Sequence, residues 1–383
     1  MLVANKKYID YLYYFKVFFL SVFLLQPWLL GGIIRFEVII ILYCLLLTIS
    51  QEKIIKVPYL ELLFSLFFLI VSLSIPVLHT TFDYTLFNRD LKIVFLFLGS
   101  FYILNRFAID KNMILATLRF TILTCLVFFI LCTLLPQFQS LSLLLKGNTY
   151  GIEGKLEVYR LWFPTSAHTF HLGLFFISIF SIQLIFGEKM IYLIPTVICA
   201  AISARSAMVC VLALLLIYTL IKDIRYILLL LILSPLFYYA VIVIVENSTQ
   251  ARYALEPIVN ILENNQFETG STNRLLEMIY IPKATHILIG SGYYTGDDGK
   301  FFGHTDSGFM RPILYGGMLY QLLYIIMLVN VYKFLMNYKT IGIIIALLFM
   351  LLNIKAEVLS PSPYFGLFCL MYWYHKSLKD VES

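Results

Sequence analysis

The sequence predicts an all-α, polytopic integral membrane protein with about 12 transmembrane helices and one large extracytoplasmic loop. Of its 383 residues, 61% are hydrophobic and only 13% are charged, whereas soluble proteins carry about 25% charged residues. Apolar runs close to the roughly 20 residues of a membrane span recur along the chain. We therefore expect residues 1–383 to form a single transmembrane domain.

The apolar runs follow one another with short polar breaks. Lys6 and Lys7 precede the first run, and no small-residue cleavage site follows it, so we expect an uncleaved first span. The runs at 34–50, 190–203 and 206–221 are shorter than a full span. The expected spans are 11–30, 34–50, 58–78, 91–107, 113–136, 161–187, 190–203, 206–221, 226–245, 310–332, 340–357 and 362–374.

Cysteine usage and charge exclude several classes of protein. The six cysteines all fall in apolar runs, where they are expected to pack as small hydrophobic residues. The sequence has no CxxC pair and no HExxH, and the neighbouring Asp297 and Asp298 point apart in most extended conformations. We therefore expect no catalytic metal and no cofactor. The formal charge of +6 fits basic loops, and no pattern indicates nucleic-acid binding.

The distribution of basic residues sets the expected orientation, because cytoplasmic loops are enriched in lysine and arginine. With both termini in the cytoplasm, the inner basic residues are nearly all lysine, whereas the outer side receives arginines. Arginine binds phosphate in a bidentate manner, so this asymmetry favours an anionic ligand on the outer face. The alternative is that these arginines pair with loop carboxylates. The outer arginines are Arg35, Arg89, Arg160, Arg205, Arg252, Arg274 and Arg311.

Two outer loops are longer than connections need to be. The smaller is expected at 137–160 and the larger at 246–309. Loops beyond about 15 residues are usually functional or disordered, and the composition of the larger one is not that of a disordered segment. Within it, Ser271 or Thr272 is expected to cap a short helix that Pro282 ends.

Three arginines are candidate ligands for phosphate. Arg160 lies at the mouth of the sixth expected span, where it either contacts a phosphate or acts as an interfacial residue. Arg205 marks a tight turn in AAISARSAMVC, and a buried positive charge there needs a carboxylate or an anionic ligand. Arg274 and Glu277 share a helix face, so Arg274 is either paired internally or directed toward a ligand.

The segment HTDSGFMRPILYGG carries the most chemistry at one place. His304 and Asp306 come directly before the tenth expected span, and Arg311 lies at its start. A histidine can take a proton from a sugar hydroxyl near neutral pH, and a carboxylate can orient it or replace it. An arginine beside them can neutralise a departing diphosphate. The alternative is that Asp306 simply caps the helix.

These motifs together resemble the O-antigen polymerase and O-antigen ligase superfamily. The resemblance rests on the polytopic frame, the turn ISARSA, the late outer loop with Arg274, and the stretches ILIGSGYYTG and HTDSGFMRPILYGG. It implies a GT-C-like glycosyltransferase in the bacterial inner membrane, with its active site facing the periplasm. Such enzymes use undecaprenyl-diphosphate-linked oligosaccharides and invert at the anomeric carbon without a metal.

The resemblance also implies roles for single residues. Arg160, Arg205 and Arg274 look like the family's diphosphate-binding arginines, and His304 looks like the loop histidine of the ligases. The ligase histidine is typically followed by an asparagine-like residue, whereas Thr305 and Asp306 follow here. The DSGF form with a downstream GG is closer to the polymerases.

The expected function is therefore polymerisation of lipid-linked repeat units into O-antigen or capsular polysaccharide. Arg160, Arg205, Arg274 and Arg311 would hold the diphosphate, and His304 with Asp306 would act on the acceptor hydroxyl. The hydrocarbon tail of the substrate would lie between helices, and membrane lipid and a chain-length regulator protein are further expected partners. One alternative is a ligase that moves finished glycan to lipid A-core. A second, from another class, is a polysaccharide flippase, although charges gathered on one face and the lack of an internal repeat do not favour it.

Overall fold

The computed structural model is mostly helical and describes residues 2–29, 34–50, 58–146, 158–222, 260, 277–296 and 299–382. The chain divides into two compact units. Unit 1 is Met1–Val38 with Asp110–Thr269, and unit 2 is Ile39–Ile109 with Gly270–Ser383. The span expected at 226–245, most of the larger outer loop and Arg274 lie outside the described residues.

Three helical stretches are long and apolar enough to cross a membrane in the described part of the chain, namely Tyr59–Leu78, Lys111–Leu134 and Met310–Lys355. Shorter apolar helices lie at Tyr11–Leu25, Phe36–Ser50, Thr169–Ile185, Met190–Ser203 and Arg205–Ile221. The apolar helices support a membrane protein, but the expectation of 12 spans is not confirmed. Most helices nevertheless begin and end within a few residues of the spans expected from the sequence.

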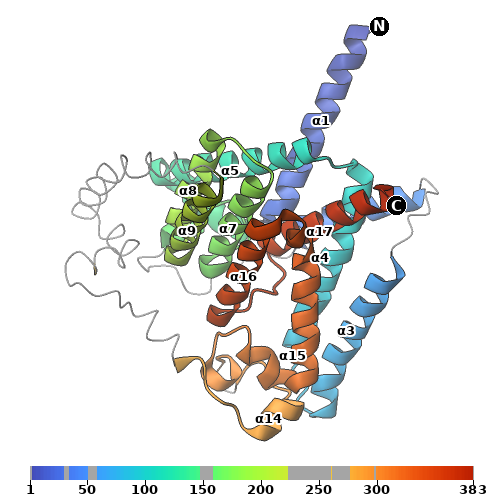
Figure 1. The fold of residues 1–383 in the computed structure, drawn as a ribbon, viewed down its shortest axis with the longest axis vertical. Helices are drawn as coiled ribbons and strands as arrows, with labels where there is room; N and C mark the ends of the chain where they lie inside the picture. The colour runs from blue at the N-terminus through green and yellow to red at the C-terminus, as the bar shows by residue number, and fades with distance from the viewer. Residues whose placement is uncertain are drawn as a thin grey trace. The chain divides into compact units, whose positions relative to one another are not determined.

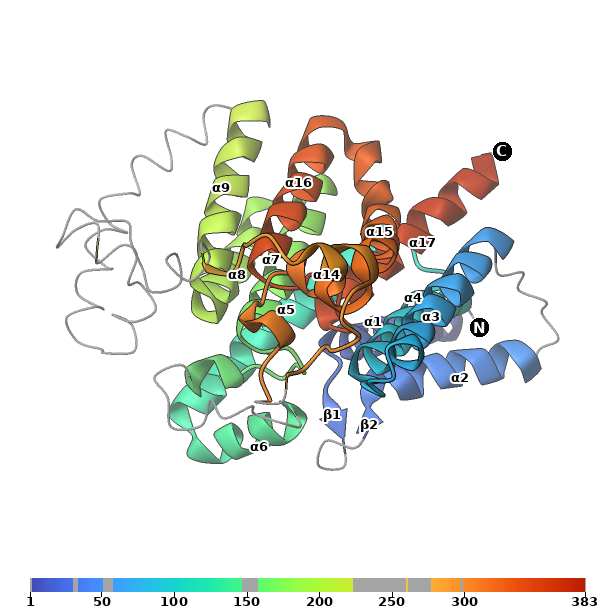
Figure 2. The same ribbon diagram turned by 90° about the horizontal axis from the view of Figure 1, so that it is seen from below.

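Unit 1 is built on pairs of packed helices. α1 packs against α5, and α7, α8 and α9 contact one another (Figure 2). α7 is buried on all sides from Leu172 to Leu184, which its uniformly apolar sequence permits. The described elements are α1 (Leu2–Leu25), β1 (Trp28–Leu29), β2 (Ile34–Arg35), the start of α2 (Phe36–Ser50), α5 (Lys111–Leu134), α6 (Pro136–Lys146), η2 (Val158–Leu161), α7 (Thr169–Ile185), α8 (Met190–Ser203) and α9 (Arg205–Lys222).

Two segments of unit 1 differ from the layout expected from the sequence. The segment expected as an outer loop at 137–160 begins with helix α6, whose Pro136 occupies the first helical position that proline favours. The sixth expected span starts later than position 161, because residues 158–161 form the 3₁₀ turn η2 and helix α7 begins only at Thr169. β1 and β2 form a short antiparallel pair in which Trp28 faces Arg35.

Unit 2 is a bundle in which α4 packs against α3 and α17, and α15 packs against α3 and α17. α14 lies against the beginning of α15 (Figure 1). Trp373 ties two of these helices together by donating a hydrogen bond of 2.7 Å to the Phe97 carbonyl. The described elements are α3 (Tyr59–Leu78), α4 (Thr85–Phe107), α14 (Ala284–Ile289), η3 (Phe302–His304), α15 (Met310–Tyr332), η4 (Lys333–Tyr338), α16 (Lys339–Lys355) and α17 (Pro363–Glu382).

The glycines of the GSG and GG motifs allow α14 and α15 to meet backbone to backbone. Gly317 breaks α15 with φ +67°, and a Cβ there would lie 2.5 Å from the Leu288 carbonyl oxygen. Gly290 has φ +80°, and a Cβ there would lie 2.2 Å from the Tyr315 oxygen. Both sites combine a left-handed backbone with close contact, which only glycine accommodates. The break fixes where the loop after α14 meets the spans.

Candidate functional site

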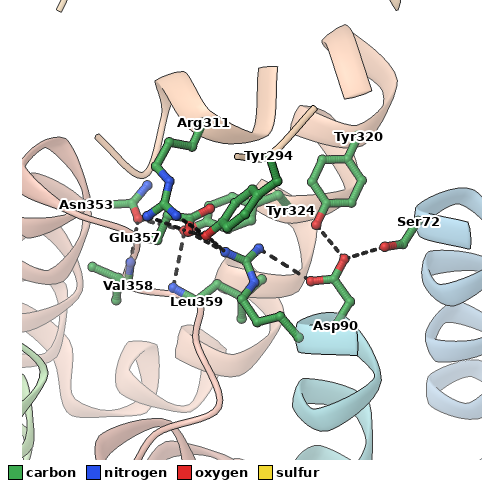
Figure 3. A network of polar contacts seen from close by, with 11 residues as sticks. Ser72, Asp90, Tyr294, Arg311, Tyr320, Tyr324, Asn353, Glu357, Val358 and Leu359 are labelled. Atoms are coloured by element: carbon green, nitrogen blue, oxygen red, sulfur yellow. Dashed lines mark hydrogen bonds and ion pairs between the residues drawn. The ribbon is translucent and has the colours of Figure 1, made fainter. Parts of the chain in front are cut away.

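Glu357 is the centre of a buried polar network at one end of unit 2 (Figure 3). It lies just beyond the end of α16, and its side chain is only 4% exposed. Its Oε2 accepts a hydrogen bond of 2.6 Å from the Tyr294 hydroxyl and lies 3.0 Å from Nη1 of Arg311. Arg89 donates to the same oxygen. Three segments far apart in sequence thus converge on one carboxylate.

Asp90 extends this network into the helical bundle. Its Oδ2 accepts hydrogen bonds from Ser72 at 2.7 Å and Tyr320 at 2.5 Å, which joins α3, α4 and α15 (Figure 3). Its Oδ1 lies 3.4 Å from Nη2 of Arg89. Arg89 therefore bridges the two carboxylates of Asp90 and Glu357, because the first turns of α4 point it toward the end of α16.

The loop after α14 supplies Tyr294 and is held at several points. Its Ser291 and Gly292 amides donate to the Leu314 and Tyr315 carbonyls at 2.7 and 2.9 Å. The Tyr294 amide donates at 2.8 Å to the carboxylate of Asp83. These bonds fix the phenol of Tyr294, which accepts from Arg89 and Arg311 and donates to Glu357.

A second set of hydrogen bonds closes the turn that carries Glu357. The amide of Val358 donates to Oδ1 of Asn353 at 2.9 Å, and the amide of Leu359 donates to the Tyr324 hydroxyl at 3.2 Å (Figure 3). Tyr324 itself donates to Asn353 at 2.8 Å. A Cβ on Gly308 would lie 2.1 Å from the same Asn353 oxygen, so this turn also fits closely against the segment before α15.

The charges of the network balance one another. It contains the guanidinium groups of Arg89 and Arg311 and the carboxylates of Asp90 and Glu357. Burial favours the neutral form of Glu357, but the two arginines and the Tyr294 hydrogen bond outweigh it and lower the pKa of this carboxyl. Burial raises the pKa of Tyr294, which keeps its hydroxyl protonated as a donor.

Arg311, a predicted diphosphate ligand, belongs to this network. Its guanidinium carbon lies 3.4 Å from the ring centroid of Phe301 and 4.4 Å from that of Tyr294, so the cation contacts two aromatic rings. Its charge is compensated by Glu357. The alternative considered for the outer arginines, pairing with a carboxylate, therefore holds for Arg311, and its buried Nε has no hydrogen-bond partner among the described residues.

His304 and Asp306 alternate with buried neighbours along one short segment. Both are exposed, whereas Thr305 and Ser307 between and after them are buried. Thr305 donates to the Met278 carbonyl at 2.8 Å, and the Gly308 amide donates to the Asn353 carbonyl at 2.8 Å. His304 sits on a left-handed backbone with φ +53°. The segment is therefore held in place while its histidine and carboxylate face outward.

The capping alternative for Asp306 is wrong. α15 begins at Met310, so Phe309 occupies the N-cap position, and no side chain among the described residues caps the helix there. It is Ser307 whose hydroxyl accepts from the Phe309 amide at 3.3 Å. Asp306 therefore does not cap α15.

The other predicted site residues fall in unit 1 or outside the described residues. Arg160 lies in η2 with 9% exposure, and its guanidinium carbon is 5.8 Å from the ring centroid of Tyr159. Arg205 is the first residue of α9 and is separated from the end of α8 by Ala204 alone, which agrees with the predicted tight turn. Arg274 is outside the described residues. Of the six predicted site residues, the structure places His304, Asp306 and Arg311 together on one segment.

Sequence reasoning missed the acidic half of the network. Arg89 was recognised as an outer arginine, but Asp90 and Glu357 were not selected. A signal was present, because NRDLK and KAEV each put a carboxylate beside a long apolar run, on the side assigned to the outside. A charged residue that folding buries at the end of a span needs a counter-charge close to it in space.

The arrangement offers two chemical capabilities. The buried network can hold the ends of α3, α4, α15 and α16 in register, and the exposed pair can exchange a proton with a ligand. In the described part of the chain, no group of three His, Cys, Asp or Glu residues comes together to hold a metal ion. The chain matches no protein-family model, no curated protein and no solved structure.

Proposed function

We propose that the chain is a membrane glycosyltransferase that joins undecaprenyl-diphosphate-linked oligosaccharide repeat units on the periplasmic face of the bacterial inner membrane. The observation that carries the proposal is the segment from His304 to Arg311. It presents a histidine and a carboxylate outward, while hydrogen bonds to Met278 and Asn353 hold its backbone. A general base needs such positioning relative to an acceptor hydroxyl.

The proposed roles differ between the exposed and buried residues. His304, with Asp306, orients or deprotonates the acceptor hydroxyl. Arg160, Arg205 and Arg274 bind the donor diphosphate, as the family resemblance implies. Arg311, expected from the sequence as a fourth diphosphate ligand, pairs with Glu357 and holds the start of α15 in position. Stabilisation of the departing diphosphate by arginines would be the largest electrostatic contribution to the reaction.

An in-vivo glycan ladder tests this function. Cells with the gene deleted are complemented with wild type, His304→Ala or Asp306→Asn, and membrane abundance is measured alongside the ladder. We expect single repeat units in the deletion, a full ladder with wild type, and a strong loss of polymer with His304→Ala at normal abundance. Lys283→Gln, an exposed change in the same unit, is the matched control and should leave the ladder intact.

The same experiment separates the alternatives. Loss of a ligase would leave long polymer on the carrier lipid, because polymerisation would continue without transfer to lipid A-core. Full ladders from both His304→Ala and Asp306→Asn would contradict the assignment of this segment to the acceptor. Substrate-dependent flux into empty liposomes containing the purified protein would instead identify a transporter.

A further inference from the structure

A pocket of about 250 Å³ lies at the end of unit 2 opposite the Glu357 network. The helices show that the pocket and the network lie at opposite ends of the unit. α3 contributes Glu61, in its first turn, to the pocket, and Ser72, about three turns later, to the network. α15 likewise has Arg311 at its start, and the pocket follows its last residue. The lining residues are Glu61, Lys333, Phe334, Asn337, Tyr372, His375, Lys376 and Lys379.

Among the described residues, three lysines but only one acidic residue line the pocket. Glu61 is already engaged, because its Oε1 accepts from the Tyr372 hydroxyl at 2.8 Å and pairs with Lys376. Lys333 and Lys379 form no ion pair with an acid among the residues that the structure describes. Both are exposed. The pocket therefore carries positive charge that Glu61 does not compensate.

Aromatic side chains form a fixed wall beside these lysines. The Phe334 and His375 rings stack with centroids 5.7 Å apart and planes at 8°. His375 Nε2 lies 2.7 Å from the Tyr338 hydroxyl, which holds the imidazole in place. Because the wall is fixed by η4 and α17 together, the pocket is preformed and does not depend on a ligand to shape it.

The surroundings of the pocket are apolar. Leu60 and Met336 are 75% and 59% exposed, and Leu378 is 43% exposed. The apolar helix α3, long enough to cross a membrane, begins at this end. Lysines at such an end, next to exposed apolar side chains, match the arrangement that attracts the anionic headgroups of the cytoplasmic leaflet.

We propose that this pocket binds a phosphate-bearing anion, either the headgroup of an anionic phospholipid or a free phosphate ester, on the side of the membrane opposite the Glu357 network. Lys333 and Lys379 provide the attraction, and Lys376, held by Glu61, provides a further N–H donor. The volume is below the roughly 300–1,000 Å³ of sites for drug-sized ligands, so it suits a headgroup better than an oligosaccharide. The inference is independent of the proposed function.

Binding to defined lipids tests the proposal. The purified full-length protein is titrated in detergent with dioleoyl phosphatidylglycerol, dioleoyl phosphatidylcholine or inorganic phosphate, and occupancy is read by native mass spectrometry and by the shift in Tm. The variant is Lys333→Gln with Lys379→Gln, and the charge-preserving variant replaces both with arginine. Lys283→Gln, exposed at the other end of unit 2, is the control.

We expect wild type and Lys283→Gln to bind phosphatidylglycerol more tightly than phosphatidylcholine, and the double glutamine variant to bind it about tenfold more weakly. The arginine variant should retain binding, and added salt should weaken it in the wild type. Equal Tm shifts with inorganic phosphate would identify a free phosphate ester as the source. Equal phosphatidylglycerol binding by wild type and the glutamine variant, or no binding of any of the three probes by wild type, would overturn the proposal.

Discussion

The two units accommodate buried cations in different ways. In unit 2, Arg89 and Arg311 are paired with carboxylates, and Glu357 contacts both. In unit 1, Lys146 at the end of α6 is fully buried and donates to the Thr165 and Ala167 carbonyls at 2.9 and 2.7 Å, and no described carboxylate pairs with it. The arginines of unit 2 are thus stabilised by charged carboxylates, whereas Lys146 in unit 1 is stabilised by the dipoles of neutral backbone carbonyls.

This difference has a consequence for protonation. Burial lowers the pKa of Lys146 to about 7, although the nearby thiols of Cys125 and Cys132 act in the opposite direction. Burial, followed by the charge of Lys146, lowers the pKa of the neighbouring His168 to about 3. In unit 2, by contrast, paired arginines lower the pKa of Glu357 and keep it ionised. Lys146 can therefore lose its proton within the folded unit 1, whereas the network around Glu357 in unit 2 depends on full charge.

The largest expected effect is on stability when Glu357 loses its charge. Glu357→Gln preserves shape but leaves two buried guanidinium groups with only Asp90, so we expect a loss of about 3–5 kcal/mol in the free energy of unfolding. Because the folded-state pKa of Glu357 is lowered, its contribution is present above the unfolded pKa and is lost as pH falls through the folded value. Thermal unfolding in detergent measures both effects.

Glu188, a carboxylate paired with a more exposed arginine, provides a comparison for Glu357→Gln. Glu188 in unit 1 accepts two bonds from Arg119, at 2.7 and 2.8 Å, but the Arg119 side chain is 37% exposed. Glu188→Gln should therefore lower the free energy of unfolding by about 1 kcal/mol or less, because water can solvate the guanidinium group of Arg119 once its partner is neutral. Equal destabilisation by the two substitutions would mean that burial of the arginines does not set the cost.

The pH dependence of Lys146 has the next largest expected effect. Its folded pKa of about 7 lies below its unfolded value of 10.5, so the unfolded chain binds the extra proton between them and stability rises with pH. We expect a gain of about 1–2 kcal/mol in the free energy of unfolding from about pH 7 to about pH 8.5.

Lys146→Met isolates this contribution, because it removes the titrating group while keeping an unbranched side chain. The difference between wild type and the variant, measured by thermal unfolding at each pH, should grow across that interval. A parallel pH dependence in the two proteins would show that Lys146 stays charged throughout, and the contrast between the units would then be one of geometry alone.

Much of the helical layout could be predicted because apolar length is a local property. The ends of α8, α9 and α15 fall within one residue of the expected spans. The break at Gly317 and the helix α6 were not expected, since both depend on contacts with other segments. Gly317 meets the carbonyl of Leu288, which only the folded chain brings near. Twelve spans stay a prediction, because the described helices include shorter apolar ones.

The candidate site was only partly predictable for the same reason. His304, Asp306 and Arg311 are close in sequence, so a local motif reveals them. Glu357 lies 46 residues beyond Arg311 and contacts it only through tertiary packing. Whether Arg311 binds a ligand or a carboxylate could not be decided from its own neighbours in the chain. The compensation of charge is a long-range property, and periodicity carries no information about it.

The last expected effect concerns Asp83, a partly buried anion stabilised by neutral groups, whereas Lys146 is a buried cation stabilised by neutral groups. Here an anion is stabilised by neutral dipoles, because its carboxylate accepts from the amides of Tyr294 at 2.8 Å, Thr295 at 3.1 Å and Thr85 at 3.1 Å. Burial alone would raise the pKa of Asp83, but these hydrogen bonds lower it. Its contribution is therefore lost as pH falls through the folded pKa.

Asp83→Asn replaces one accepting oxygen by an NH₂ group, which cannot accept from an amide. Because the side chain is only partly buried, we expect a loss of about 1 kcal/mol in the free energy of unfolding. Asp306→Asn, at an exposed carboxylate, should leave stability unchanged in the same thermal measurement. If Asp83→Asn cost as much as Glu357→Gln, dipoles would stabilise charge in this unit as strongly as ion pairs do. The loop bearing Tyr294, and not the arginines, would then hold the network together.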